Sequence, residues 1–122
     1  MKVLADTSIW VDHFRRADAQ LAELLDRGDI VVHPFVIGEL ILGGLPTASE
    51  MLDDLNALPR ATVASNDEVQ EFIVKRKLPG LGIGYVDVHL LASAMLTAES
   101  SIWTRDKRLL AAAKSLRLAA DI

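Results

Sequence analysis

The chain has 122 residues, of which 51% are hydrophobic, and it carries a formal net charge of −4. This length suits a single domain, and the hydrophobic fraction is too high for a disordered chain. The absence of cysteine excludes disulfides, thiolate metal ligands and cysteine nucleophiles. Any bound metal must therefore use oxygen or imidazole ligands, and the net acidity gives no sign of a nucleic-acid partner.

No apolar segment reaches about 18 residues, the length at which a membrane span is suspected. The amino terminus meets Asp6 too early for the apolar segment of a secretory signal. We therefore expect a cytoplasmic protein with no membrane contact, in which residues 1–122 form one domain.

Strands and helices are predicted in alternation along the chain. Apolar segments predict strands over residues 2–5, 30–33, 62–64 and 101–104, with a further short strand near Leu118. Capping residues and helical spacing predict helices over residues 9–14, 19–27, 34–42, 49–58, 67–77, 86–96 and 106–115. This alternation predicts an α/β fold with a mostly parallel sheet of four or five strands flanked by helices.

Local signals suggest how several of these helices begin and end. Ser8, Asp18 and Asn66 are expected N-caps, and Pro34 begins the third helix. The segment Gly43–Pro46 is expected to end that helix, whose apolar residues predict that it is largely buried.

Four acidic residues lie in apolar surroundings, and these are Asp6, Glu39, Asp87 and Asp106. An ionised carboxylate at a buried or half-buried position costs several kcal/mol unless a cation or a donor network compensates. Asp6 and Asp106 each follow a predicted strand, where ligands of parallel sheets bind. The four therefore predict a shared metal site, and oxygen ligands favour one or two Mg²⁺ or Mn²⁺ ions.

Other polar residues are weaker candidates for this site. Thr7, Ser8 and Thr104 could hydrogen-bond the carboxylates or bound water, although ordinary capping explains them equally well. The three histidines, His13, His33 and His89, lack the spacing of metal ligands and are interpreted as structural. Asp12 is set aside because a carboxylate is favoured in the first turn of a helix.

Basic residues form two clusters beside the predicted site loops. From these clusters we select as phosphate-binding candidates Lys75, Arg76, Lys77, Arg105 and Arg108. A solvated helix face is the alternative interpretation of the same charges. The glycine-rich segment that follows Lys77 is expected to be a loop, and it lacks the spacing of a dinucleotide-binding fingerprint.

The motifs carrying these acids resemble those of one known family. They are Asp6-Thr7-Ser8 after the first strand, Glu39 inside the third helix, Asp87 within Gly84–Ala92, and Thr104–Leu109 near the end. In their order and spacing the whole chain resembles the PIN-domain ribonucleases, and specifically the VapC-type toxins of bacterial toxin–antitoxin pairs.

The resemblance implies a fold, an activity and partners. It implies a three-layer PIN fold and endonucleolytic RNA cleavage with Mg²⁺ or Mn²⁺ bound by Asp6, Glu39, Asp87 and Asp106. It assigns support of these acids to Ser8 and Thr104. It further implies a homodimer and inhibition by a cognate VapB-like antitoxin encoded beside this gene.

Exposed apolar side chains suggest where such an antitoxin binds. We expect Trp10, Phe14 and Phe35 to be partly exposed, and we place the antitoxin groove on residues 9–14 and 35–45.

Two alternatives to the nuclease stay open. A non-enzymatic interaction domain could carry the acids as a structural cation site. A phosphoryl acceptor could use Asp6 as its nucleophile, but a phosphatase of that kind has a second aspartate where Ser8 stands. A receiver domain would need a downstream lysine, which we cannot locate.

Overall fold

A computed structural model describes residues 1–44 and 50–122 of the chain. Within these residues the sheet is three-stranded, with the order β2 (Ile30–Val31), β1 (Lys2–Ala5) and β3 (Ser100–Trp103). Both strand pairs are parallel, with Leu4 opposite Val31 on one side and Ile102 on the other. The α/β class with a parallel sheet is confirmed, but the expected sheet of four or five strands is too large.

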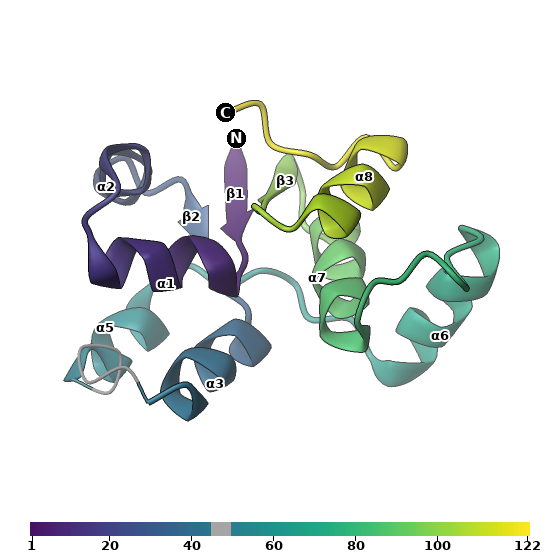
Figure 1. The fold of residues 1–122 in the computed structure, drawn as a ribbon, viewed down its shortest axis with the longest axis horizontal. Helices are drawn as coiled ribbons and strands as arrows, with labels where there is room; N and C mark the ends of the chain where they lie inside the picture. Colours follow the sequence, from purple (N-terminus) through teal and green to yellow (C-terminus); the bar gives the residue numbers. More distant parts are fainter. Residues whose placement is uncertain (45–49) are drawn as a thin grey trace.

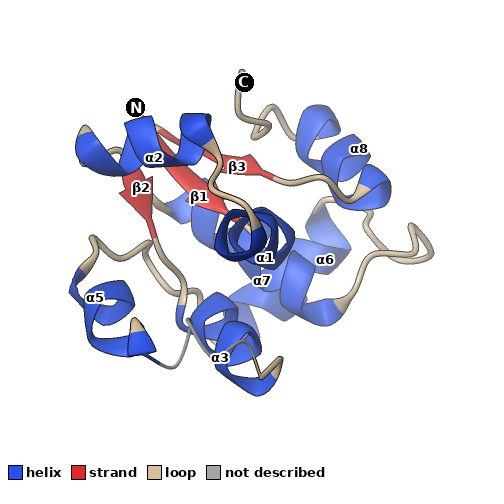
Figure 2. Ribbon diagram, turned by 60° about the vertical axis from the view of Figure 1, so that its left-hand side comes forward, coloured by secondary structure: helices blue, strands red, loops and turns tan. Residues whose placement is uncertain are grey.

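The described helices are α1 (Thr7–Arg15), α2 (Ala19–Asp26), α3 (Pro34–Leu42), α5 (Leu52–Ala57), α6 (Asn66–Lys75), α7 (Tyr85–Leu96) and α8 (Lys107–Ser115). Figures 1 and 2 show α1 and α2 on one face of the sheet and α7 on the other, which gives three layers. The crossovers of parallel strands require this arrangement, because β2 and β3 lie on opposite sides of β1.

The predicted strand over 62–64 is absent for a visible reason. The Thr62 amide donates to the Thr97 hydroxyl at 2.9 Å, so it is not available to a neighbouring strand. Just before this segment, Arg60 forms an isolated parallel bridge with Val32. Near Leu118 the expected strand is reduced to a similar bridge between Ile102 and Ala119.

Two of the expected N-caps are displaced by one or two residues. Asp6, rather than Ser8, caps α1 by accepting from the Ile9 amide. Ser65, rather than Asn66, caps α6 in a reciprocal arrangement with Glu68. Asp18 caps α2 as predicted. Ser49, Leu45 and Pro46, which we expected at the boundaries of neighbouring helices, lie outside the described residues.

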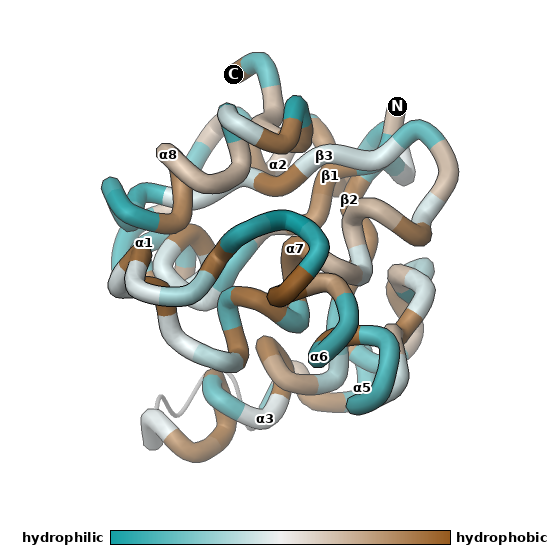
Figure 3. The backbone as a smooth tube through the Cα atoms, turned by 90° about the vertical axis from the view of Figure 1, so that its right-hand side faces the viewer, coloured by the Kyte–Doolittle hydropathy of each residue, from teal (hydrophilic) through white to brown (hydrophobic). Residues whose placement is uncertain are grey.

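The hydrophobic core surrounds β1, whose residues Val3, Leu4 and Ala5 are fully buried. Trp10 packs into this core and is only 1% exposed, so the expectation that it lies at the surface is wrong. Figure 3 shows β1 beside β2 and β3, with the tube at β1 in the brown of hydrophobic residues. The core thereby anchors the residues that follow β1 and β3.

Helix α3 is less buried than predicted. Val36, Ile37 and Leu40 enter the core, whereas Ile41 and Leu42 are exposed, the latter by 88%. Two different faces of the helix are therefore apolar, and within residues 1–44 and 50–122 only one of them is covered.

Among the described residues, we find no helix with the length and apolar character needed to cross a membrane.

Candidate functional site

The four selected acids come from four separate elements. Asp6 directly follows β1, Asp106 follows β3 and caps α8, Glu39 lies within α3, and Asp87 lies in the first turn of α7. Asp6 is buried and Asp87 is half-buried, but Glu39 and Asp106 are exposed. The expectation of buried or half-buried surroundings is therefore wrong for these two, because the described chain leaves one face of α3 and the start of α8 uncovered.

Asp6 is held by hydrogen bonds to both carboxylate oxygens. The Ser8 hydroxyl donates to Oδ1 at 2.5 Å, and the Thr104 hydroxyl donates to Oδ2. Thr104 Oγ1 also accepts from the Asp106 amide at 3.0 Å, so one hydroxyl links the two acids. The contacts that the sequence analysis suggested for Ser8 and Thr104 are present in the structure.

Glu39 is connected to the start of α1. The Thr7 hydroxyl donates to Glu39 Oε1 at 2.7 Å, across 32 residues of sequence. Because Thr7 directly follows Asp6, this contact ties α3 to the carboxyl end of β1. Thr7 thus contacts Glu39 as Ser8 and Thr104 contact Asp6.

The pKa of Asp87 is affected by the charges of the other three acids. Burial raises the pKa of the Asp87 carboxyl above its ordinary value, and the charges of Asp106, Asp6 and Glu39 raise this pKa further. The Gly84 amide, 3.3 Å from Oδ2, acts in the opposite direction. Like charges raise a carboxyl pKa only when they are close, so the fold brings the four acids into one electrostatic neighbourhood.

The donor set suits a hard divalent cation. All four side chains offer oxygen, the ligand atom that Mg²⁺ and Mn²⁺ prefer. In the described part of the chain, however, no three His, Asp or Glu side chains converge closely enough to enclose an ion by themselves. The oxygen donors of these side chains would therefore suit Mg²⁺ or Mn²⁺, and Mg²⁺ commonly takes only one or two carboxylates directly while it keeps several waters.

The selected basic residues have different surroundings. Arg105 is paired with two carboxylates, those of Asp12 and Asp18, and Lys75 pairs with Glu71 at 3.0 Å. Arg108 instead approaches the Gly82 carbonyl at 3.5 Å, in the loop that leads to α7.

The remaining two, Arg76 and Lys77, are exposed at the end of α6. Lys75 and Arg76 also line a cavity of about 200 Å³ against α7 residues such as Met95.

Two of the three histidines accept hydrogen bonds from backbone amides. His33 caps α3 by accepting from the Phe35 amide at 3.0 Å. His13 accepts from the Asp18 amide at 2.9 Å. His89 is buried on α7 between the rings of Phe35 and Tyr85, away from the half-exposed Asp87.

An apolar groove lies beside the acids. Its volume is about 590 Å³, and it is lined by Pro34, Phe35, Gly38, Glu39, Ile41, Leu42 and Val86. Glu39 thus belongs both to the acidic site and to the wall of this groove. The groove lies on the α3 segment selected for an antitoxin, whereas in the α1 segment Ile9 and Trp10 are buried.

Comparisons with known proteins agree with this geometry. The pattern of the PIN domain family matches residues 3–115. Over 110 residues the chain is 46% identical to Ribonuclease VapC32 from two strains of Mycobacterium tuberculosis, covering 90% of this chain and 89% of the relative. A crystal structure of PAE2754 from Pyrobaculum aerophilum matches with a TM-score of 0.61 and 20% identity, covering 93% and 81% of the two chains, which supports the fold alone.

Proposed function

This chain belongs to the PIN-domain family, and on that premise we propose that it is a toxin of the VapC type. Its activity is metal-dependent endonucleolytic hydrolysis of RNA in the cytoplasm. The name of its relative, Ribonuclease VapC32, supports RNA as the substrate.

One observation carries the proposal beyond family membership. The pKa of Asp87 is raised by burial and by the charges of Asp106, Asp6 and Glu39, so four acids from four different elements, Asp87 included, act on one another. Bringing like charges together destabilises the fold unless a cation neutralises them. The arrangement is therefore understandable as a site for Mg²⁺ or Mn²⁺, one or two ions, with these four acids as its ligands and catalytic residues.

Phosphodiester hydrolysis suits such a site. When bound, a divalent ion lowers the pKa of coordinated water and neutralises charge on the phosphate. The protein must then hold acceptor oxygens at fixed positions. Ser8 and Thr104 do this for Asp6, and Thr7 does it for Glu39.

A protein nucleophile is not required by this chemistry. A phosphatase that used Asp6 as its nucleophile would have a second aspartate at position 8, where Ser8 stands and donates to Asp6 Oδ1. The phosphoryl-acceptor alternative is therefore disfavoured. The interaction-domain alternative differs from the nuclease by predicting no metal-dependent cleavage.

Basic residues around the site are proposed to contact the RNA backbone. Arg108 is the best placed of these, because it lies beside the loop that leads to Asp87 and only two residues after Asp106. Lys75, Arg76 and Lys77 are proposed to contact more distant phosphates. The guanidinium of Arg105 is instead paired with two carboxylates of its own chain, those of Asp12 and Asp18.

The partners proposed are a VapB-like antitoxin and a second copy of the chain. The groove beside Glu39 supports an antitoxin that binds through apolar side chains and blocks the acidic site. A basic residue of the antitoxin facing the four acids would complete the inhibition.

The direct test replaces each acid singly by its amide, as Asp6→Asn, Glu39→Gln, Asp87→Asn and Asp106→Asn. Total bacterial RNA is incubated with each variant and Mg²⁺ or Mn²⁺, and the new RNA ends are sequenced. We expect cleavage at defined positions by the wild type and its loss in every variant. Asp26→Asn, an exposed aspartate at the end of α2, serves as the matched control.

Two results would count against the proposal. Wild-type protein that leaves RNA intact with either ion would favour the interaction domain. A variant that cleaves at the wild-type rate would remove its residue from the catalytic set.

A further inference from the structure

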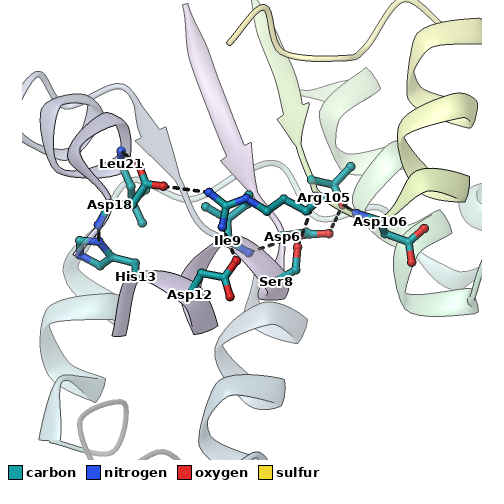
Figure 4. A network of polar contacts seen from close by, with 10 residues as sticks. Asp6, Ser8, Ile9, Asp12, His13, Asp18, Leu21, Arg105 and Asp106 are labelled. Atoms are coloured by element: carbon teal, nitrogen blue, oxygen red, sulfur yellow. Dashed lines mark hydrogen bonds and ion pairs between the residues drawn. The ribbon is translucent and has the colours of Figure 1, made fainter. Parts of the chain in front are cut away.

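Arg105 lies between two residues of the candidate site but points away from it. Thr104 before it donates to Asp6, and Asp106 after it caps α8. The Arg105 guanidinium instead reaches Asp12 in α1 and Asp18 at the start of α2, the latter at 2.8 Å (Figure 4). Arg105 thereby contacts Asp18, which lies 87 residues earlier in the sequence, and Asp12, which lies 93 residues earlier.

The two acceptors are themselves fixed. Asp18 uses its Oδ1 to accept from the Leu21 amide at 3.0 Å, which leaves Oδ2 for Arg105. The Leu21 amide and then the Arg105 guanidinium hold the pKa of Asp18 below its ordinary value, against the effect of burial. Asp12 belongs to α1, the helix that Asp6 caps. Arg105 therefore binds to the elements that begin at Asp6 and Asp18.

A neighbouring ring also limits the position of Arg105. Its guanidinium carbon lies 6.0 Å from the centre of the Trp103 ring, and Trp103 is buried. The Arg105 amide donates to the Ser8 hydroxyl in a long contact of 3.5 Å, and Ser8 also lies in α1. Both ends of this residue are thus turned towards α1.

These contacts have a geometric consequence. The Ala5–Trp103 register and the Thr104–Asp6 hydrogen bond already join the segment 104–106 to the end of β1. The hydrogen bonds of the Arg105 guanidinium to Asp12 and Asp18 join this segment to α1 and to the start of α2 as well, outside the sheet. Since Asp106 follows Arg105 directly, this attachment restricts where Asp106 can lie relative to Asp6.

We propose that Arg105 is a positioning residue, whose fork to Asp12 and Asp18 holds the Thr104–Asp106 segment against α1 and so sets the placement of Asp106 relative to Asp6. The proposal rests on the proposed nuclease function for its catalytic consequence, but not for its structural one. It differs from a phosphate contact, because the guanidinium binds carboxylates of its own chain.

The test compares Arg105→Ala and Arg105→Lys with Arg27→Ala. Arg27 is a matched control because it also bridges two carboxylates, those of Glu23 and Asp29, but lies at the end of α2. Kinetics are measured on an RNA oligonucleotide carrying the cleavage position mapped for the wild type. Hydrogen exchange of the Asp106 amide is measured relative to the Leu4 amide of the core.

Misplacing a catalytic group by about 1 Å can cost up to roughly a hundredfold in rate, so we expect kcat of Arg105→Ala to fall about tenfold or more. KM and the salt dependence of RNA binding should stay within about twofold of the wild type, since no phosphate contact is removed. The Asp106 amide should exchange faster relative to Leu4.

Arg105→Lys should recover part of kcat, because an ammonium can bind one carboxylate but lacks the planar fork. Arg27→Ala should keep wild-type kcat and Asp106 exchange.

Asp12→Asn combined with Asp18→Asn should reproduce the kcat of Arg105→Ala, and adding Arg105→Ala to that pair should change kcat little further.

A raised KM and a weaker salt dependence of RNA binding in Arg105→Ala, with unchanged kcat, would assign Arg105 to phosphate binding and overturn the proposal. Unchanged Asp106 exchange in Arg105→Ala would overturn it as well. If the wild type cleaves no RNA, the proposed function fails, and the exchange measurement alone still decides whether Arg105 holds this segment.

Discussion

His33 illustrates how burial makes one side chain sensitive to pH. It is fully buried, and desolvation together with the charge of His89 lowers the pKa of His33 from 6.5 to about 4. Its Nδ1 must stay unprotonated to accept from the Phe35 amide and cap α3. The neutral form is therefore the one that fits the fold.

The pH dependence follows from this shift. Between pH 6.5 and 4 the unfolded chain binds a proton at His33 that the folded chain excludes, so stability falls as pH falls through this window. The full effect of such a shift is about 3 kcal/mol. His33→Asn, which retains a cap acceptor, should flatten the curve of unfolding free energy against pH in urea titrations. An unchanged slope would mean that burial in the folded protein does not lower the pKa of His33.

Gly82 shows how a single missing side chain permits a contact. It has a φ of +75°, and a Cβ at this position would lie 2.6 Å from Arg108 Nη1. Gly80 has a similar φ of +81°, but a Cβ there would meet nothing within 4 Å. The two glycines are therefore matched in backbone conformation and differ in what surrounds them.

Alanine substitution separates these effects. Gly80→Ala and Gly82→Ala should each lose about 1 kcal/mol of stability, because both residues would adopt left-handed backbone. Only Gly82→Ala should also displace the flexible Arg108 side chain, and it should raise KM for RNA as Arg108→Ala does. Equal RNA kinetics in the two variants would remove Arg108 from the proposed phosphate contacts.

At the scale of elements, α3 carries two apolar faces with different roles. One face, with Val36 and Leu40, is buried in the core, and the other lines the groove beside Glu39. A sequence window cannot separate these faces, because both contribute similar residues. Only the packing of α3 against α1 and α5 assigns one face to the interior.

Charge substitution in the groove tests the proposed antitoxin site. Leu42→Glu should abolish binding of the antitoxin encoded beside this gene, while the melting temperature stays near that of the wild type, because Leu42 is 88% exposed. Val74→Glu on α6, where Val74 is 75% exposed, is the control and should bind normally. Binding is measured by calorimetry with the purified antitoxin. Loss of binding only in Val74→Glu would move the interface to α6.

At the scale of the whole molecule, the four acids couple the stability of the fold to divalent cations. At roughly ten times its Kd, an ion that binds only the folded protein stabilises it by about 1.4 kcal/mol. The melting temperature should therefore rise by several degrees with Mg²⁺ or Mn²⁺, measured by scanning calorimetry at constant ionic strength. Asp6→Asn should lose most of this rise, and an equal rise in the variant would contradict a ligand role for Asp6.

The sequence by itself determined features that depend on neighbouring residues. Apolar alternation and capping predicted the α/β class and most helices, including the Asp18 cap of α2 and the start of α3 at Pro34. Apolar surroundings singled out Asp6, Glu39, Asp87 and Asp106, because charged residues are rarely placed there without a reason. The motifs around them indicated the family that the comparisons confirm.

The tertiary structure decided features that depend on contacts between distant segments. No strand forms over residues 62–64, where the Thr62 amide donates instead to Thr97, 35 residues away. The exposure of Glu39 depends on which face of α3 packs inward. The partners of Arg105 lie 87 and 93 residues earlier in the chain. Local propensity carries no information about such pairs, because they become neighbours only when the parallel strands align and bring the ends of β1 and β3 together.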